Sequence, residues 1–100
     1  MPRISYSPIA LQDLIRLGNI LKTKNPETAK RAVKTISVAI EAIKNQPDRF
    51  RPVPEMVNFR EVIIDFGASG YIARYYKKSD DEIIIVRIKH QLEVDFDVVE

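Results

Sequence analysis

The sequence predicts an α+β domain in which a short first strand precedes a two-helix antiparallel hairpin packed on an antiparallel sheet, in the order β-α-α-β-β-β. Two observations predict the helices: apolar residues recur at helical spacing in two segments, and each segment begins with a capping residue followed by proline. A third observation predicts the sheet, because apolar and polar residues alternate in the segments on either side of a turn-forming GASG.

The composition indicates one soluble domain spanning residues 1–100. The chain has 100 residues, 45% of them hydrophobic, which suffices for a single core. It contains no cysteine, which excludes disulfides and thiol catalysis and suits a reducing compartment. It has neither the apolar run of a signal peptide nor about eighteen consecutive apolar residues that would span a bilayer. We therefore expect a cytoplasmic protein without a membrane partner.

Charge is distributed unevenly along the chain. Residues 1–90 hold all sixteen Lys and Arg residues against ten Asp and Glu residues, a balance of +6, whereas residues 91–100 form an acidic tail with four acids and no cation. A basic body is compatible with a phosphate or with an acidic protein partner. The cations are less dense than in proteins whose main task is to hold a nucleic acid backbone.

The first elements are a strand at residues 3–7 and a helix that begins after Ser7 and Pro8 and ends near Lys22. Serine accepts hydrogen bonds from the free amides of a first helical turn, and proline lacks only an N–H that would be unbonded there. Asn25 and Pro26 repeat this pattern before the second helix. The link at residues 23–25 is short, so the helices are antiparallel neighbours. Their apolar stripes comprise Leu11, Leu14, Ile15, Gly18 and Leu21 in the first, and Ala29, Val33, Ile36, Ile40 and Ile43 in the second.

The second half of the chain predicts a three-stranded meander. Prolines at positions 47, 52 and 54 exclude further helix, so residues 45–56 form a surface connection anchored by Phe50. A strand follows at residues 58–66, and GASG leads into a hairpin at residues 71–91. Strict alternation in the last strand predicts two faces, Ile84, Val86 and Ile88 on one, and Ile83, Ile85, Arg87 and Lys89 on the other. A functional site is expected where this strand turns from apolar to basic residues.

The acidic tail also alternates. Leu92, Val94, Phe96 and Val98 are separated by single residues, which predicts a further strand at a sheet edge or against a second copy. A homodimer is therefore left open. If the tail is disordered in the free protein, it is a candidate binding arm.

Four motifs in this order carry a resemblance to a known family: S-P-x-A-x-x-D-L from Ser7, N-P-x-x-A from Asn25, P-x-x-x-R-P-V-P-E from Pro47, and R-I-K-H from Arg87. From residue 3 to 92 the chain resembles the ParE branch of the RelE/ParE superfamily of bacterial toxins. The resemblance implies the toxin of a type II toxin–antitoxin module, of the kind linked to plasmid stabilization. It also implies a compact fold of two helices on a curved antiparallel sheet.

The superfamily implies two alternative activities. RelE-like members resemble ribosome-dependent mRNA endonucleases, which need cations for the scissile phosphate and groups for proton transfer. ParE-like members poison DNA gyrase and need no catalytic set. Where the nuclease branch tends to carry an Arg, this chain holds Tyr71 or Ile72, and Gln91 stands where an aromatic residue would stack on a base. The incomplete set favours a gyrase inhibitor without catalysis; the alternative is an mRNA interferase using Arg60, Arg74, Arg87 and His90.

The candidate partner-binding residues are Arg60, Tyr71, Arg74, Arg87, Lys89 and His90. Each also has a structural explanation. The head of Arg60 can pair with Glu61 or Glu55, whereas Arg74 is expected to be exposed. Arg87 and Lys89 form either a recognition patch or salt bridges to the acidic tail. A lone histidine such as His90 is more often packed or capping than catalytic.

The expected partners are a cognate antitoxin and DNA gyrase, with DNA contacted only indirectly through either of them. The antitoxin is expected to lay an acidic extended or helical segment over the basic sheet and the grooves beside the helices. Neither a cofactor nor a metal is expected, because the single histidine has no ligand-type neighbour at a recognised spacing and Asp80, Asp81 and Glu82 form a solvated turn.

Overall fold

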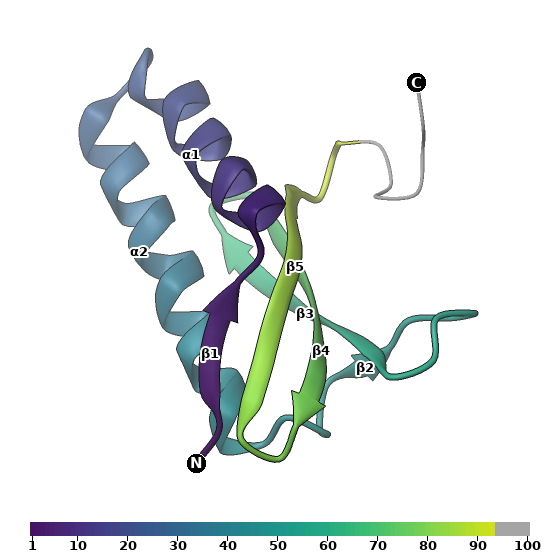
Figure 1. Ribbon diagram of the computed structural model, residues 1–100. Coiled ribbons are helices and arrows are strands. Elements are labelled where there is room, and N and C mark those ends of the chain that lie inside the picture. Colours follow the sequence, from purple (N-terminus) through teal and green to yellow (C-terminus); the bar gives the residue numbers. More distant parts are fainter. Residues whose placement is uncertain (94–100) are drawn as a thin grey trace.

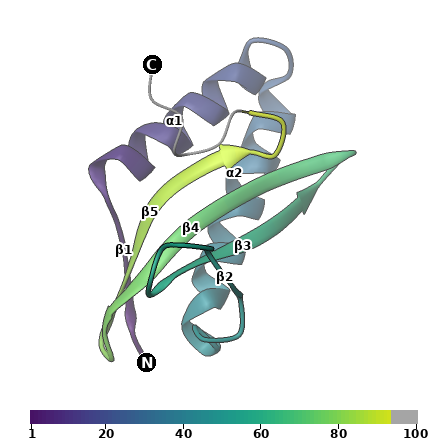
Figure 2. The same cartoon turned by 90° about the vertical axis from the view of Figure 1, so that its right-hand side faces the viewer.

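The computed structural model describes residues 1–93 as two helices packed on one face of a five-stranded sheet (Figures 1 and 2). The sheet has the order β1-β5-β4-β3-β2. In chain order the elements are β1 (Arg3–Tyr6), α1 (Pro8–Lys22), α2 (Pro26–Ala42), the short 3-10 helix η1 (Ile43–Asn45), β2 (Arg51–Pro52), β3 (Phe59–Phe66), β4 (Ser69–Ser79) and β5 (Glu82–His90). The predicted architecture is confirmed. The predicted strand in the tail falls on residues outside the described range, except for its first positions.

The sheet differs from the expected one in its first strand. β3, β4 and β5 form the predicted antiparallel meander, but β1 pairs with β5 in parallel, Arg3 opposite Glu82 and Tyr6 opposite Ile85. The sheet is therefore mixed. The connection from β1 to β5 passes through the whole helical hairpin and the meander, which allows the parallel direction.

Both predicted helix starts are confirmed. Ser7 Oγ accepts a hydrogen bond from the Ala10 amide at 3.0 Å, and Asn25 Oδ1 accepts bonds from the amides of Glu27 and Thr28 at 3.1 and 3.2 Å. Ser7 Oγ also donates to the Val86 carbonyl at 3.0 Å, so the same hydroxyl caps α1 and joins it to β5.

The core lies between the helical hairpin and the sheet. Its fully buried residues include Ile36 and Ile40 on α2 and Ile43 on η1. On the strands they include Tyr75, Ile83, Ile85 and Ile88. Phe50 packs against this core and meets the Tyr75 ring edge-on, with 6.3 Å between centroids, which confirms it as the anchor of the connection. The Tyr75 hydroxyl donates to the Pro47 carbonyl at 2.6 Å, and burial raises the Tyr75 pKa to about 12.

The predicted faces of β5 are wrong beyond Ile85. Ile85 of β5 pairs with Tyr75 of β4, and the next pair is Arg87 with Arg74. β5 therefore has one residue more than β4 at this point, and Val86 is the extra residue of a β-bulge. Alternation restarts after the bulge. Ile88 therefore shares the buried helix-facing side with Ile83 and Ile85, instead of the opposite face.

Candidate functional site

The predicted site residues lie on three neighbouring strands. The register of β4 and β5 places Tyr71 opposite His90 and Arg74 opposite Arg87, whereas Arg60 lies at the far end of β3. Arg74, Arg87 and Lys89 stand by register on the face of the sheet away from the helices, which we call the open face. Arg74, Arg87 and Lys89 therefore share one face, whereas Tyr71 and His90 lie on the opposite, helix-facing side, and Arg60 pairs with Tyr75, next to Arg74.

Arg74 is buried, which corrects the expectation that it is exposed. Its side chain is 8% exposed and donates through Nε and Nη2 to Glu61 Oε2, at 3.1 and 2.8 Å. Its Nη1 contacts the sulfur of Met56 at 3.2 Å, and Arg51 holds the other oxygen of Glu61 at 3.0 Å. The loop between β2 and β3 covers Arg74, and a paired carboxylate compensates its charge.

Arg87 is bound to α1, where it forms an ion pair with Asp13. Asp13 is 5% exposed, and its Oδ2 accepts hydrogen bonds from Arg87 Nε and from the Ile88 amide, both at 2.9 Å. Arg16 lies 3.5 Å from the second oxygen. β1 pairs with β5 only as far as Ile85, so Asp13 satisfies an amide of β5 beyond the end of β1.

Lys89 and His90 are tied to the turn that follows β5. Lys89 Nζ donates to the carbonyl of Glu93 at 3.0 Å, and the amide of His90 donates to the Glu93 carboxylate at 2.9 Å. Arg16 also forms an ion pair with this carboxylate. Among the described residues, the contacts of this strand to the tail are hydrogen bonds to Glu93 and not the predicted salt bridges of Arg87 and Lys89; the rest of the tail, residues 94–100, lies outside the described part of the chain.

Both ring nitrogens of His90 have partners. Nδ1 accepts a hydrogen bond from the Leu92 amide at 3.1 Å, so Nε2 carries the proton and donates to Ser69 Oγ at 2.9 Å. In this tautomer the imidazole does not accept the proton of the serine, so the pair is not an activated nucleophile. The Tyr71 ring meets His90 edge-on at 5.3 Å, and burial raises the Tyr71 pKa.

Arg60 binds the surface connection at residues 45–56 and not the carboxylate that was expected. Its Nη1 donates to the Phe50 carbonyl at 2.6 Å, and neither Glu61 nor Glu55 is paired with it among residues 1–93. The predicted partner was therefore wrong, although a structural contact was expected.

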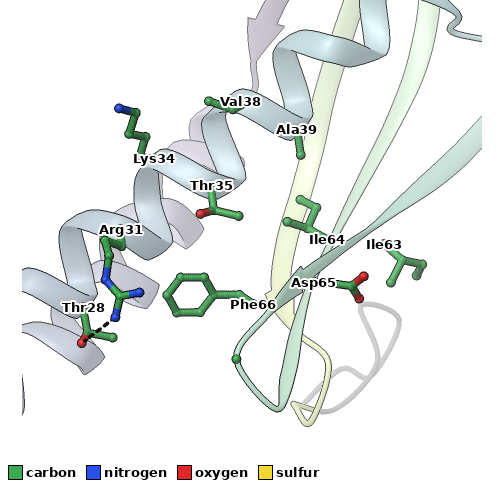
Figure 3. A pocket seen from close by; sticks show the side chains of 11 residues that line it. Thr28, Arg31, Lys34, Thr35, Val38, Ala39, Ile63, Ile64, Asp65 and Phe66 are labelled. Atoms are coloured by element: carbon green, nitrogen blue, oxygen red, sulfur yellow. Dashed lines mark hydrogen bonds between the residues drawn. The ribbon is translucent and has the colours of Figure 1, made fainter.

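A groove of about 890 Å³ lies between α2 and the outer edge of β3 (Figure 3); the sequence analysis expected grooves beside the helices but did not name the residues that line this one. Val38 and Ile63, 60% and 44% exposed, lie on its two sides, and the Arg31 guanidinium lies 5.7 Å from the centroid of the Phe66 ring. β2 pairs only with Arg60 and Glu61, so within the described chain the edge of β3 from residue 62 to 66 has no neighbouring strand on that side. The consecutive apolar pair Ile63 and Ile64 was the available signal, because alternation should have put a polar residue at one of them.

A second, smaller cavity of about 430 Å³ lies where α1 crosses the end of the sheet. Its lining includes Leu17, Leu21 and Phe66 beside Tyr71 and His90. Among residues 1–93 there is no group of three or more His, Asp or Glu side chains that could hold a metal ion. No helix of the described chain is long and apolar enough to cross a membrane.

Comparison with known proteins places this fold among toxins. The chain is 33% identical over 93 residues to Toxin RelE3 of Caulobacter vibrioides, covering 93% of this chain and 98% of that protein. It is 32% identical over 84 residues to Toxin RelE1 of the same organism, covering 84% and 87%. A solved structure described as the chromosomal ParDE TA system from P. aeruginosa has the same fold, with a TM-score of 0.77 at 22% identity over 90% of this chain and 96% of that one.

A family model described as the ParE toxin of the type II toxin-antitoxin system, parDE, matches residues 4–94. This match spans nearly the whole chain and agrees with the motifs, whose residues now have structural roles: Ser7 caps α1, Asp13 holds β5, and Asn25 caps α2. The chain belongs to the ParE toxin family of type II toxin–antitoxin systems.

Proposed function

We propose that this protein is a toxin that inhibits DNA gyrase by protein–protein contact and that a cognate antitoxin neutralises it. One observation carries the proposal: the arginines and the histidine that a nuclease would use are already bound to other residues of the protein. Arg74 and Arg87 are paired with Glu61 and Asp13, and the His90 imidazole is fixed between Ser69 and Leu92.

An RNA endonuclease needs cations that can reach a phosphate and a histidine that can transfer a proton. To bind a phosphate, Arg74 would have to leave a carboxylate inside a site where it is only 8% exposed, and the unpaired Glu61 would then be costly. Arg60 donates a hydrogen bond to the backbone carbonyl of Phe50. These contacts support a folding role for the cations and a function that requires no catalytic set.

The antitoxin is expected in the groove between α2 and β3. The unpaired edge of β3 offers backbone groups to an added strand, while Val38, Ile63 and Phe66 offer apolar surface. Arg31 at the rim suits an acidic segment, since opposite charges steer the approach and fix the register.

The test measures both activities on the same preparation. Purified protein is added to DNA gyrase in a supercoiling assay and, in parallel, to translating ribosomes in an mRNA cleavage assay. Loss of supercoiling or trapped cleaved DNA, with intact mRNA, is the expected result. Cleaved mRNA with unaffected gyrase would overturn the proposal in favour of the interferase, the activity that the names of the RelE relatives suggest.

A further inference from the structure

Four lysines, at the end of α1, in the turn that follows it and in the first half of α2, differ from most other cations of the described chain. Between residues 1 and 93, Arg3, Arg16, Lys44, Arg51, Arg74, Lys77, Lys78 and Arg87 form ion pairs with carboxylates. In the same range Lys22, Lys24 and Lys34 form none, although all three are exposed. Lys30 has only Glu27, at 3.7 Å, and both side chains are about four-fifths exposed, 78% and 81%, so this pair contributes little. We call these four residues the lysine ridge: Lys22, Lys24, Lys30 and Lys34.

The ridge gives one end of the molecule a strong local charge. Residues 22–34 contain five cations and one acid, whereas the whole chain has a net charge of only +2. Figure 1 shows the turn between α1 and α2 at one end of the molecule and the β4–β5 turn, with Asp80, Asp81 and Glu82, at the other. Such a charge separation orients the molecule in the field of a polyanion, with the hairpin tip leading.

Of the four ridge residues, Lys34 also lines the groove beside α2. Figure 3 shows the end of the Lys34 side chain pointing away from Phe66, while Arg31 lies against Phe66 and donates to Thr28 at 3.4 Å. Between residues 22 and 34 no large apolar side chain is exposed, and the exposed Ile20 and Val38 lie just before and just after this stretch. Binding to a phosphodiester backbone needs only accessible cations.

We propose that the lysine ridge binds the phosphodiester backbone of a nucleic acid without regard to sequence. Flexible, exposed lysine ammonium groups suit phosphate oxygens, and release of the counterions around the nucleic acid supplies the free energy. The contact would hold the toxin near its target. This inference does not depend on the gyrase proposal. Both alternative targets offer a phosphodiester backbone, because gyrase binds duplex DNA and the ribosome contains RNA.

The test compares two variants with equal loss of charge. The ridge variant carries Lys22→Gln, Lys24→Gln, Lys30→Gln and Lys34→Gln. The control carries Arg3→Gln, Lys44→Gln, Lys77→Gln and Lys78→Gln, four cations that sit in surface ion pairs. Fluorescence anisotropy measures binding to a labelled duplex DNA of arbitrary sequence and to a single-stranded RNA, between about 50 and 200 mM salt. Circular dichroism and thermal unfolding verify that both variants are folded.

Wild-type binding is expected to weaken steeply with salt, and the ridge variant is expected to bind duplex DNA at least about tenfold more weakly at low salt. Its plot of log affinity against log salt should be flatter by about 0.9 for each lost phosphate contact. The control should stay within about threefold of wild type. Parallel losses on DNA and RNA support backbone recognition, and loss on one of them alone identifies the nucleic acid that the ridge prefers.

Three results would overturn the proposal. The first is wild-type protein that shows no salt-dependent binding to either nucleic acid. The second is an equal loss in the ridge and control variants, which would make the effect one of net charge alone. The third is a ridge variant that retains nucleic acid binding but loses the cognate antitoxin, which would assign the ridge to an acidic protein.

Discussion

Asp13 on α1 and Arg87 on β5 form a contact that joins the helical hairpin to the strand carrying three of the six predicted site residues, with 2.9 Å between Oδ2 and Nε. The same oxygen accepts the Ile88 amide, next to the bulge at Val86. A carboxylate in the first motif of the chain thus fixes the R-I-K-H motif near its end. The contact lies directly after the bulge, where β5 changes its buried face.

Replacement of Asp13 by alanine is expected to destabilise the protein by about 2–3 kcal/mol, because the Ile88 amide would lose its partner and Arg87 its counter-charge. Urea unfolding followed by circular dichroism measures the change. Glu41→Ala is the matched control: it removes a helical carboxylate whose pair with Lys44 is exposed, and should cost less than about 1 kcal/mol. Equal losses of stability in the two variants would show that the buried Asp13 contact stabilises the fold no more than an exposed ion pair does.

The helices and their limits could be predicted from the sequence because their causes are local. The side chains of Ser7 and Asn25 accept hydrogen bonds from amides two or three residues later, and Pro8 and Pro26 have no amide N–H that would need a partner. The residues next to each helix start are therefore enough to predict it. The strands of the meander could be predicted for the same reason. The parallel pairing of β1 with β5 could not, because it joins segments about 80 residues apart.

The surroundings of the site residues could not be predicted, since they depend on distant parts of the chain. Alternation indicates which face Arg74 occupies, but a loop carrying Met56 decides that it is buried. The bulge at Val86 reverses a face without a mark in the local sequence, because the stabilising carboxylate is Asp13. The residues that line the groove could not be named in advance, because an exposed apolar residue such as Val38 is common on a helix and only the fold places it beside Ile63.

Val38→Asp is expected to weaken binding of the cognate antitoxin by about tenfold or more, because it puts a charge into the apolar groove that an acidic segment would fill. Val38 is 60% exposed, so the fold should tolerate the change. Isothermal titration calorimetry with the purified antitoxin measures the affinity. Ile15→Asp is the control, since Ile15 is similarly exposed, at 64%, but lies on α1 outside the groove. If Ile15→Asp weakens binding and Val38→Asp does not, the antitoxin binds α1 instead.

His90→Ala is expected to reduce toxicity by less than about tenfold if the protein has no catalytic set, whereas loss of a general acid or base typically costs about 10²- to 10⁴-fold. The measurement is the concentration that halves gyrase supercoiling, alongside the mRNA cleavage rate. Ser69→Ala removes the hydrogen bond to Nε2 and leaves the imidazole in place, so it reports the structural part of the effect. A hundredfold loss in His90→Ala with an unchanged Ser69→Ala would indicate catalysis.

Tyr75 is expected to make the fold sensitive to alkali. Desolvation raises its pKa in the folded state to about 12, against an ordinary value of 10.0. Below pH 10 the phenol is protonated in both states and its full contribution to stability is present. As pH rises from 10 towards 12 only the unfolded state loses the proton, so the free energy of unfolding falls, by about 2–3 kcal/mol once the upper value is reached.

Urea unfolding at pH 8 to 11.5 tests this, with Tyr75→Phe as the comparison. The variant loses the bond to the Pro47 carbonyl and is expected to be about 1 kcal/mol less stable at pH 8, but its stability should fall less steeply above pH 10. Some slope should remain, because burial also raises the pKa of Tyr6 and Tyr71. Parallel curves for the two proteins across this range would mean that Tyr75 ionises in the folded state as readily as in the unfolded one, and that the buried phenol is not the source of the alkaline loss.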